Sequence, residues 1–312
     1  FCIDIASCMQ YQFFADSVSK DIDIPMTCQI ALSTKHLAEK IDTHGVHEAN
    51  ISKSLPIKFV QYNVQTFKDE SDEIDLYARF MISKCAVACI QENRKTYSGI
   101  KDMYGYFRCI AAGHAGSHGV EVAISKSLPF ALDAEGNKIF VEREHVSILF
   151  SDPRCIIVRI CNKALDFYVS SAHAPFLQST TDHKKWWENF KAQIKNHCRF
   201  RKPVLLGMDI NCQIYDSELF STWGLGPKGG KHPANFTNMC SCIEELCITF
   251  PAGDISKHSN PSEYGTYNPT VGNHTIVIDQ IGTIGHIQVL PKSLCTEPGL
   301  TRALQVGNDH IP

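Results

Sequence analysis

Short apolar runs in this sequence repeatedly end on a polar residue of a type that can hold a metal ion or move a proton. Five such runs end on Asn63, Glu92, His173, Asp209 and Asp279. Buried strands tolerate carboxylates and imidazoles only where these groups are paired, hydrogen-bonded or bound to a metal. One strand-end Asn or Asp alone is more often a turn or cap residue. Several in one chain predict a shared polar site where the strand ends meet.

The elements that must hold these residues are mainly strands. Apolar runs of strand length occur at 57–62, 85–91, 120–124, 146–150, 155–161, 167–172, 203–208, 275–278 and 287–290. Two stretches favour helices: 69–84, where Ile74, Ala78 and Met81 follow at helical spacing, and about 181–197. Strands outnumber helices, which predicts an α+β protein with two sheets packed face to face and helices outside.

Trp186, Trp187 and Phe190 lie close to several lysines on the second predicted helix. This pattern has two interpretations: a platform on which bases stack, or the apolar face of an amphipathic helix packed on the core. The helical spacing of Trp187, Phe190 and Ile194 favours core packing.

Composition limits the classes of protein that fit. Apolar residues make up 44% and charged residues 20%, the net charge is −3 and the pI is near 6.5. We therefore expect no membrane-spanning segment, and any nucleic acid must be held by a local patch rather than by the charge of the whole molecule. The 14 cysteines include no CxxC pair, so reduced and mostly buried thiols are expected rather than a zinc site.

The regular pattern starts near position 57, and it divides the chain into two parts. Residues 1–55 mix apolar and polar residues without a firm period, although 30–41 could form a helix, and we interpret them as an N-terminal appendage. Residues 56–312 are predicted to form one domain. A signal peptide is not expected because residues 1–15 lack a basic start and a small-residue cleavage site. The sequence leaves the compartment open, with an intracellular location, including the nucleus, as the candidate.

Seven motifs in order resemble those of one family. They are Tyr-Asn-Val at 62–64, Gln-Glu at 91–92, Gly-Val-Glu-Val-Ala-Ile at 119–124, Ala-His-Ala-Pro at 172–175, Gly-Met-Asp-Ile-Asn at 207–211, Ile-Asp-Gln at 278–280 and Asp-His-Ile-Pro at 309–312. Over residues 57–312 the sequence resembles the endonuclease/exonuclease/phosphatase (DNase I-like) superfamily, and within it most of all the endonuclease domains of LINE-type retrotransposons. The resemblance implies a four-layer α/β/β/α sandwich with its site at the rim of the two sheets.

The resemblance also implies a role for each matched residue. Glu92 matches the ligand of a divalent cation, usually Mg²⁺ with Mn²⁺ as a substitute, with Asn63 and Asp309 close to the metal. Asp279 matches the carboxylate that orients His310. Asp209 and Asn211 match an Asp-x-Asn pair, and either Asp209 or His310 handles the proton of the attacking water. Asn63, Asn211 and Tyr267 are candidates for substrate contact, although a plain turn explains Tyr267 equally well.

Two departures from the family pattern matter. His173 stands where many members carry Tyr, so its hydrogen bond to phosphate would depend on its protonation. No Arg follows Asp279, which disfavours a phosphoinositide substrate. The sequence thus predicts a Mg²⁺-dependent phosphodiesterase on nucleic acid, most of all a DNA endonuclease of the retroelement or apurinic-site type, with a reverse transcriptase domain as a candidate partner. The alternatives are a phosphodiesterase on a smaller or lipid substrate, and an inactive relic that serves as a binding module.

Overall fold

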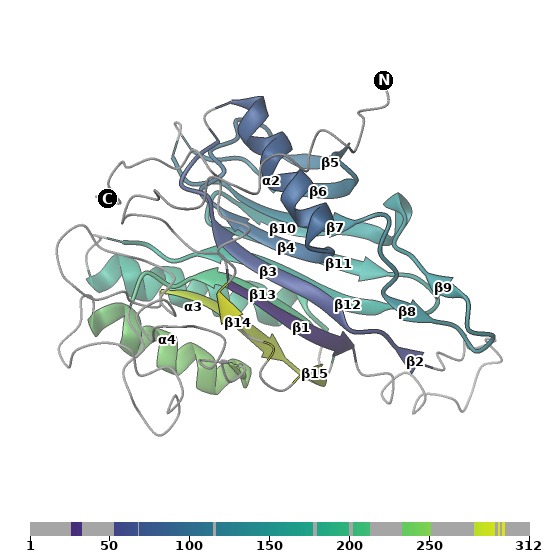
Figure 1. Cartoon of the computed structure of the whole chain (residues 1–312). Coiled ribbons are helices and arrows are strands. Elements are labelled where there is room, and N and C mark those ends of the chain that lie inside the picture. The colour runs from purple at the N-terminus through teal and green to yellow at the C-terminus, as the bar shows by residue number, and fades with distance from the viewer. Residues whose placement is uncertain are drawn as a thin grey trace.

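The computed structural model describes residues 26–32, 53–67, 69–114, 117–176, 180–199, 202–212, 233–250, 278–290, 293 and 295–296. Tyr267, Asp309 and His310 lie outside these ranges. The core of this part of the chain is a pair of sheets with helices on their outer sides (Figure 1). None of its helices has the length and apolar content needed to cross a membrane.

The first sheet runs in the order β15-β1-β3-β4-β7-β6-β5, with β16 also paired to β1. Its strands are β1 (Met26–Leu32), β3 (Ile57–Asn63), β4 (Cys85–Gln91), β5 (Gly99–Met103), β6 (Tyr106–Ala111), β7 (Val120–Ser125), β15 (Ile287–Val289) and β16 (Cys295–Thr296). β3 and β4 are parallel neighbours, so both end at the same edge. The side chains predicted to form the polar site lie at that edge.

At β1 the structure differs from two expectations, the N-terminal appendage at 1–55 and the helix at 30–41. Residues 26–32 fall in the predicted appendage, yet they pair with β3 and β15 inside the first sheet. The same strand occupies the first positions of the helix considered for 30–41. Backbone pairing to two neighbours outweighs the weak helical period of this stretch.

The second sheet runs in the order β10-β11-β12-β13-β14. Its strands are β10 (Val146–Asp152), β11 (Cys155–Cys161), β12 (Asp166–His173), β13 (Val204–Asp209) and β14 (Asp279–Ile284). β12 and β13 are parallel, and β14 runs antiparallel to β13. A small third sheet joins β2 (Lys53–Ser54), β8 (Ala131–Leu132) and β9 (Lys138–Ile139).

The two large sheets pack face to face through one continuous core. At its centre Gly207 lies so close to the opposite sheet that a Cβ there would meet the Cβ of Cys89 at 2.4 Å. A glycine at this position lets the sheets approach, because any side chain would need the same space. The ten cysteines whose side chains the structure describes are free thiols, and six of them are buried, as expected. No group of metal-binding side chains found there contains a cysteine.

α2 (Glu70–Ile82) covers the first sheet, and its predicted existence is confirmed. Asp69 caps it by accepting hydrogen bonds from the backbone N–H groups of Ser71 and Asp72. Ile74 and Met81, whose helical spacing predicted this helix, are exposed, and α2 instead buries its other side, including Glu73. Glu73 pairs there with a buried arginine of the sheet, so a charged residue occupies an inner position that a hydrophobic pattern cannot reveal.

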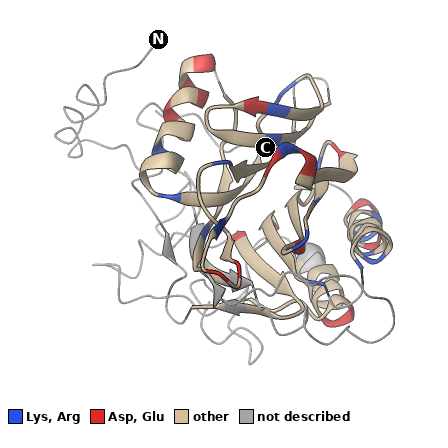
Figure 2. Ribbon diagram, turned by 90° about the vertical axis from the view of Figure 1, so that its right-hand side faces the viewer, with Lys and Arg blue, Asp and Glu red and all other residues tan. Residues whose placement is uncertain are grey.

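α3 (Thr180–His197) and α4 (Pro233–Leu246) cover the second sheet on the opposite side (Figure 1). Trp187 and Phe190 are buried in the core, and Trp186 stacks on Phe190 with ring centroids 5.5 Å apart. Core packing is therefore confirmed for this face. Helix, sheet, sheet and helix form the four-layer α/β/β/α sandwich that was expected, and both signs of charge occur on its described surface (Figure 2).

Candidate active site

Strand direction brings the predicted side chains to one edge of the sandwich. His173 ends β12 and Asp209 ends the parallel β13, and the two residues are direct register partners. Asp209 in turn pairs with Asp279 of β14. From the other sheet, Asn63 ends β3 and Glu92 directly follows β4.

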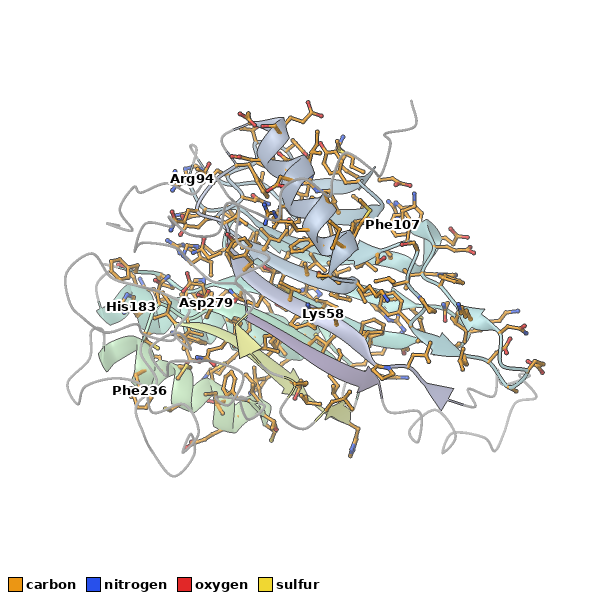
Figure 3. The ribbon with its side chains drawn as sticks, in the orientation of Figure 1. Lys58, Arg94, Phe107, His183, Phe236 and Asp279 are labelled. Atoms are coloured by element: carbon orange, nitrogen blue, oxygen red, sulfur yellow. The ribbon has the colours of Figure 1, made fainter. Side chains whose placement is uncertain are left out.

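Asp279 corrects a sequence expectation. It was expected to end an apolar strand, but it begins β14. Because β14 is antiparallel to β13, its first residue lies at the edge where β13 ends, so Asp279 reaches the same site from the opposite chain direction. Figure 3 shows Asp279 and Arg94 near the same end of the two sheets, with Phe107 toward the other end.

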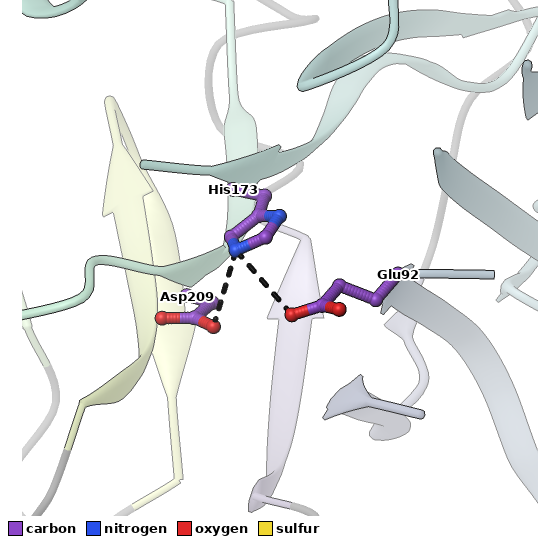
Figure 4. Close-up of side chains that lie close together, drawn as sticks. All are labelled: Glu92, His173 and Asp209. Carbon is purple, nitrogen blue, oxygen red and sulfur yellow. Dashed lines mark ion pairs between the residues drawn. The ribbon is translucent and has the colours of Figure 1, made fainter. Parts of the chain in front are cut away.

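Glu92, His173 and Asp209 form a tight cluster (Figure 4). The Nε2 atom of His173 lies 3.6 Å from Oε1 of Glu92 and 3.7 Å from Oδ2 of Asp209. One potential ligand atom from each of the three residues lies within 4.8 Å of the others. Two carboxylates and an imidazole at this spacing can surround one ion.

Asn63 connects the two carboxylates. Its Nδ2 donates to Oδ2 of Asp209 at 2.9 Å and to Oε1 of Glu92 at 3.1 Å, whereas its Oδ1 accepts from the backbone N–H of Gln65 at 2.9 Å. The amide therefore turns its nitrogen, not its oxygen, toward the cluster. In this arrangement Asn63 holds Glu92 and Asp209 together across the gap between the sheets.

The Asp-x-Asn pair is held by its own backbone. Oδ1 of Asp209 accepts from the backbone N–H of Asn211 at 2.9 Å, and Nδ2 of Asn211 donates to the carbonyl of Ala174 at 2.8 Å. Asn211 adopts a left-handed backbone with φ of +45°, which Asn tolerates better than most residues. The pair thus fixes one oxygen of Asp209 and leaves the other directed at Asn63 and His173.

Gln61 is a residue that the sequence reading missed. It is buried between the sheets, and its Nε2 donates to Oδ1 of Asp279 at 2.7 Å and to Oε1 of Gln91 at 2.8 Å. Gln91 continues the chain by donating to Oγ of Ser171 at 2.9 Å. This polar chain crosses from one sheet to the other directly behind the site. The signal in the sequence was two glutamines, Gln61 and Gln91, each at a position in an apolar strand where apolar residues are usual.

Arg154 and His118 were also missed. Nη1 of Arg154 donates to the carbonyls of His173 and Ala174, both at 3.3 Å, and its Nη2 lies 3.0 Å from Nε2 of His118. The His118 ring packs edge-on against the His173 ring. Burial and the adjacent Arg154 lower the pKa of His118, so the neutral imidazole is favoured there. Burial also lowers the pKa of Arg154, while Glu92 and Asp209 oppose that shift.

The donor set fits a divalent cation. Mg²⁺ takes oxygen ligands, of which Glu92 and Asp209 each offer a carboxylate, and it keeps several waters, so one or two carboxylates suffice. Mn²⁺ in addition accepts an imidazole such as that of His173. The second acidic and His group of the described residues, Glu142, Glu144 and His145, is mostly exposed, and His145 already accepts from the Glu142 backbone at 3.0 Å. It has no comparable enclosure.

No protein-family model and no curated protein sequence matches the chain. Solved structures do resemble it. One is the endonuclease domain of TRAS1, a telomere-specific non-LTR retrotransposon, with a TM-score of 0.45 and 13% identity over 72% of this chain and 82% of that one.

Two other similar structures are AP endonucleases. The enzyme from Archaeoglobus fulgidus has a TM-score of 0.46 and 15% identity, over 70% of this chain and 85% of its own. LMAP from Leishmania major has a TM-score of 0.49 and 11% identity, over 81% of this chain and 87% of its own.

Proposed function

We propose that this protein is a divalent-metal-dependent phosphodiester hydrolase that cuts DNA internally. The observation that carries the proposal is the meeting of Glu92 from one sheet with Asp209 and His173 from the other, with ligand atoms within 4.8 Å. Like charges placed this close repel each other, so the two carboxylates need a cation or a donor such as Asn63 between them. A phosphate ester is a suitable substrate for such a site because it brings negative charge that a cation neutralises.

Each residue has a proposed part in the reaction. Glu92 and one oxygen of Asp209 hold the cation, which when bound draws charge from the phosphoryl oxygens. Asp209 also positions or deprotonates the attacking water. His173 donates a hydrogen bond to a phosphate oxygen when it is protonated at Nε2. Asn63 keeps the two carboxylates at a fixed separation.

Asp279 and the residues outside the described ranges complete the proposal. We place His310 against the scissile phosphate, oriented by Asp279, with Asp309 near the metal and Tyr267 on the substrate. Gln61 supports this role of Asp279, since its N–H group donates to Oδ1 and helps to fix the orientation of the carboxylate. Retroelement-type nicking, a reverse transcriptase partner and a nuclear location stay predictions of the sequence.

The deciding experiment is a nicking assay on supercoiled plasmid with Mg²⁺, with Mn²⁺ and with a chelator. We expect relaxed circular plasmid in the presence of either metal and no relaxed plasmid with the chelator. No cleavage of plasmid, combined with hydrolysis of a small phosphodiester, would favour a smaller substrate. Absence of any metal-dependent hydrolysis, combined with retained DNA binding, would favour the inactive binding module.

A further inference from the structure

The loop that carries Glu92 has an unusual backbone. Glu92 has φ of +54° and Arg94 has φ of +50°, so two non-glycine residues on either side of Asn93 are left-handed. Such residues persist only where the surrounding structure determines their conformation. The loop must therefore be held from outside, and the direction of the Glu92 carboxylate depends on what holds it.

Asn93 is the residue that ties this loop to the first sheet. It is buried, its Nδ2 donates to Oε2 of Glu121 at 3.3 Å, and its Oδ1 accepts from the backbone N–H of Lys95 at 3.1 Å. Its own backbone N–H donates to the carbonyl of Gly119 at 3.2 Å. A Cβ on Gly119 would lie 2.3 Å from Oδ1 of Asn93, so the loop packs directly on that glycine.

Glu121 is itself fixed by a buried network of ions. Nε and Nη2 of Arg108 donate to its two oxygens at 2.6 and 2.9 Å, and the hydroxyl of Tyr77 donates to Oε1. Nη1 of Arg108 donates to Glu73 at 2.6 Å, and Glu73 also pairs with Lys95. The layer between α2 and the first sheet thus holds two carboxylates, Glu73 and Glu121, and two basic side chains, Arg108 and Lys95.

This network touches the loop at two alternate positions. Asn93 and Lys95 turn toward it, whereas Glu92 and Arg94 turn to the other side, where Nη2 of Arg94 lies 3.3 Å from Oε2 of Glu92. A buried ion network is weak evidence for stability, because apolar residues of similar volume often do as well. Hydrogen bonds have a preferred direction, however, and apolar contacts do not. The network can therefore fix the orientation of the loop in a way that apolar side chains could not.

We propose that Asn93 and Glu121 are positioning residues for Glu92, and that the affinity of the site for a divalent cation depends on the hydrogen bond between them. The inference rests on the proposed metal-dependent function. Residues that orient a metal ligand typically change metal affinity or activity by about 10- to 100-fold when they are removed. The effect should fall on metal binding more than on the rate at saturating metal.

The test compares Asn93→Ala with Asn162→Ala by calorimetric titration with Mn²⁺ and by plasmid nicking over a range of Mg²⁺ concentrations. Asn162 is a matched control, since it also accepts backbone N–H groups, from Ala164 and Leu165, in the turn between β11 and β12. That turn lies at the opposite ends of those strands from His173. Asn93→Ala should raise the Kd for Mn²⁺ about tenfold, and Asn162→Ala should leave it unchanged.

The outcomes separate the two proposals. An unaltered chain that binds no Mn²⁺ and cuts nothing would overturn the proposed function itself. An unaltered chain that binds Mn²⁺, together with an Asn93→Ala variant of equal Kd, would overturn only the positioning role. If Asn93→Ala does not fold, as judged by circular dichroism, Asn93→Ser replaces it, because its hydroxyl can still accept from the Lys95 N–H but is too short to reach Glu121. An unchanged Kd in that folded variant would equally overturn the inference.

Discussion

His173 and Asp209 are direct partners on neighbouring parallel strands, and Nε2 of His173 lies 3.7 Å from Oδ2 of Asp209. Side chains paired in this way project from the same face and reach the same edge. Glu92 approaches the pair from the other sheet, 3.6 Å from the same nitrogen. The candidate site is therefore a property of the interface between two sheets, and its tests should separate side-chain chemistry from sheet packing.

Glu92→Gln should abolish metal-dependent cleavage and leave the fold intact. The amide has nearly the same shape but lacks the ligand charge that a cation requires. Plasmid nicking at limiting Mg²⁺ measures the loss, and circular dichroism checks the fold. Glu135→Gln, an exposed acid in a turn, is the matched control and should change neither. Normal cleavage by Glu92→Gln at limiting Mg²⁺ would rule out the ligand role.

Gln61→Leu should slow cleavage by about one to two orders of magnitude, because Asp279 would lose a hydrogen bond that fixes its carboxylate. Gln280→Leu is the control: Gln280 is buried on the same strand as Asp279, and its amide has no hydrogen-bond partner within the described ranges. Replacing an unsatisfied buried amide by an apolar group should leave the rate unchanged and maintain or raise the melting temperature. Equal cleavage rates for the native chain, Gln61→Leu and Gln280→Leu would show that Gln61 has no role in the site.

Asp279→Asn and His310→Ala should each reduce the single-turnover rate by several orders of magnitude, and the double variant should be little worse than the slower single one. The carboxylate is proposed to act through the imidazole, so its loss matters little once the imidazole is gone. The comparison needs the three variants and the native chain on one plasmid substrate. Losses that multiply would show that the two residues act independently.

Gly207→Ala should destabilise the sandwich by about 1–3 kcal/mol, because the added methyl group would meet the Cβ of Cys89 at 2.4 Å and force the sheets apart. Chemical denaturation measures the change in the free energy of unfolding. Adding Cys89→Gly removes the opposing Cβ and should recover part of the loss. A Gly207→Ala variant as stable as the native chain would contradict the close approach of the sheets.

Acid sensitivity should depend on Glu245, which joins α4 to α3. Hydrogen bonds from Lys191 and Lys195, at 2.6 and 3.0 Å, lower its pKa to about 2 from an ordinary value near 4.5. A lowered carboxyl pKa contributes stability that is full above pH 4.5 and is lost as the pH falls through about 2. Glu245→Gln should therefore have a lower melting temperature than the native chain at pH 7, and the difference should vanish near pH 2.

A melting-temperature difference between Glu245→Gln and the native chain that does not change between pH 7 and pH 2 would contradict this titration. Glu244→Gln is a suitable control, because Glu244 is its exposed neighbour on α4 and makes neither of these two lysine contacts. That variant should melt like the native chain at both pH values.

The layers of the fold, and the convergence of most of the candidate site, could be predicted from local patterns in the sequence. Apolar runs of strand length, with polar residues at their ends, identified Asn63, Glu92, His173 and Asp209, because a two-residue period and a strand end are local features. The burial of Glu73 on the helix at 70–82 was not accessible in this way, since Glu73 lies opposite an arginine that is distant in sequence.

The pairing of side chains within the site became visible only in the folded structure. The bridge of Asn63 between two carboxylates, the support of Asp279 by Gln61 and the hold of Asn93 on Glu121 each join residues from separate strands or loops. Such contacts depend on strand order, strand direction and the spacing of two sheets, which a single sequence does not encode locally. Asp279 illustrates the reason: an antiparallel strand delivers its first residue to the edge where its neighbour delivers its last.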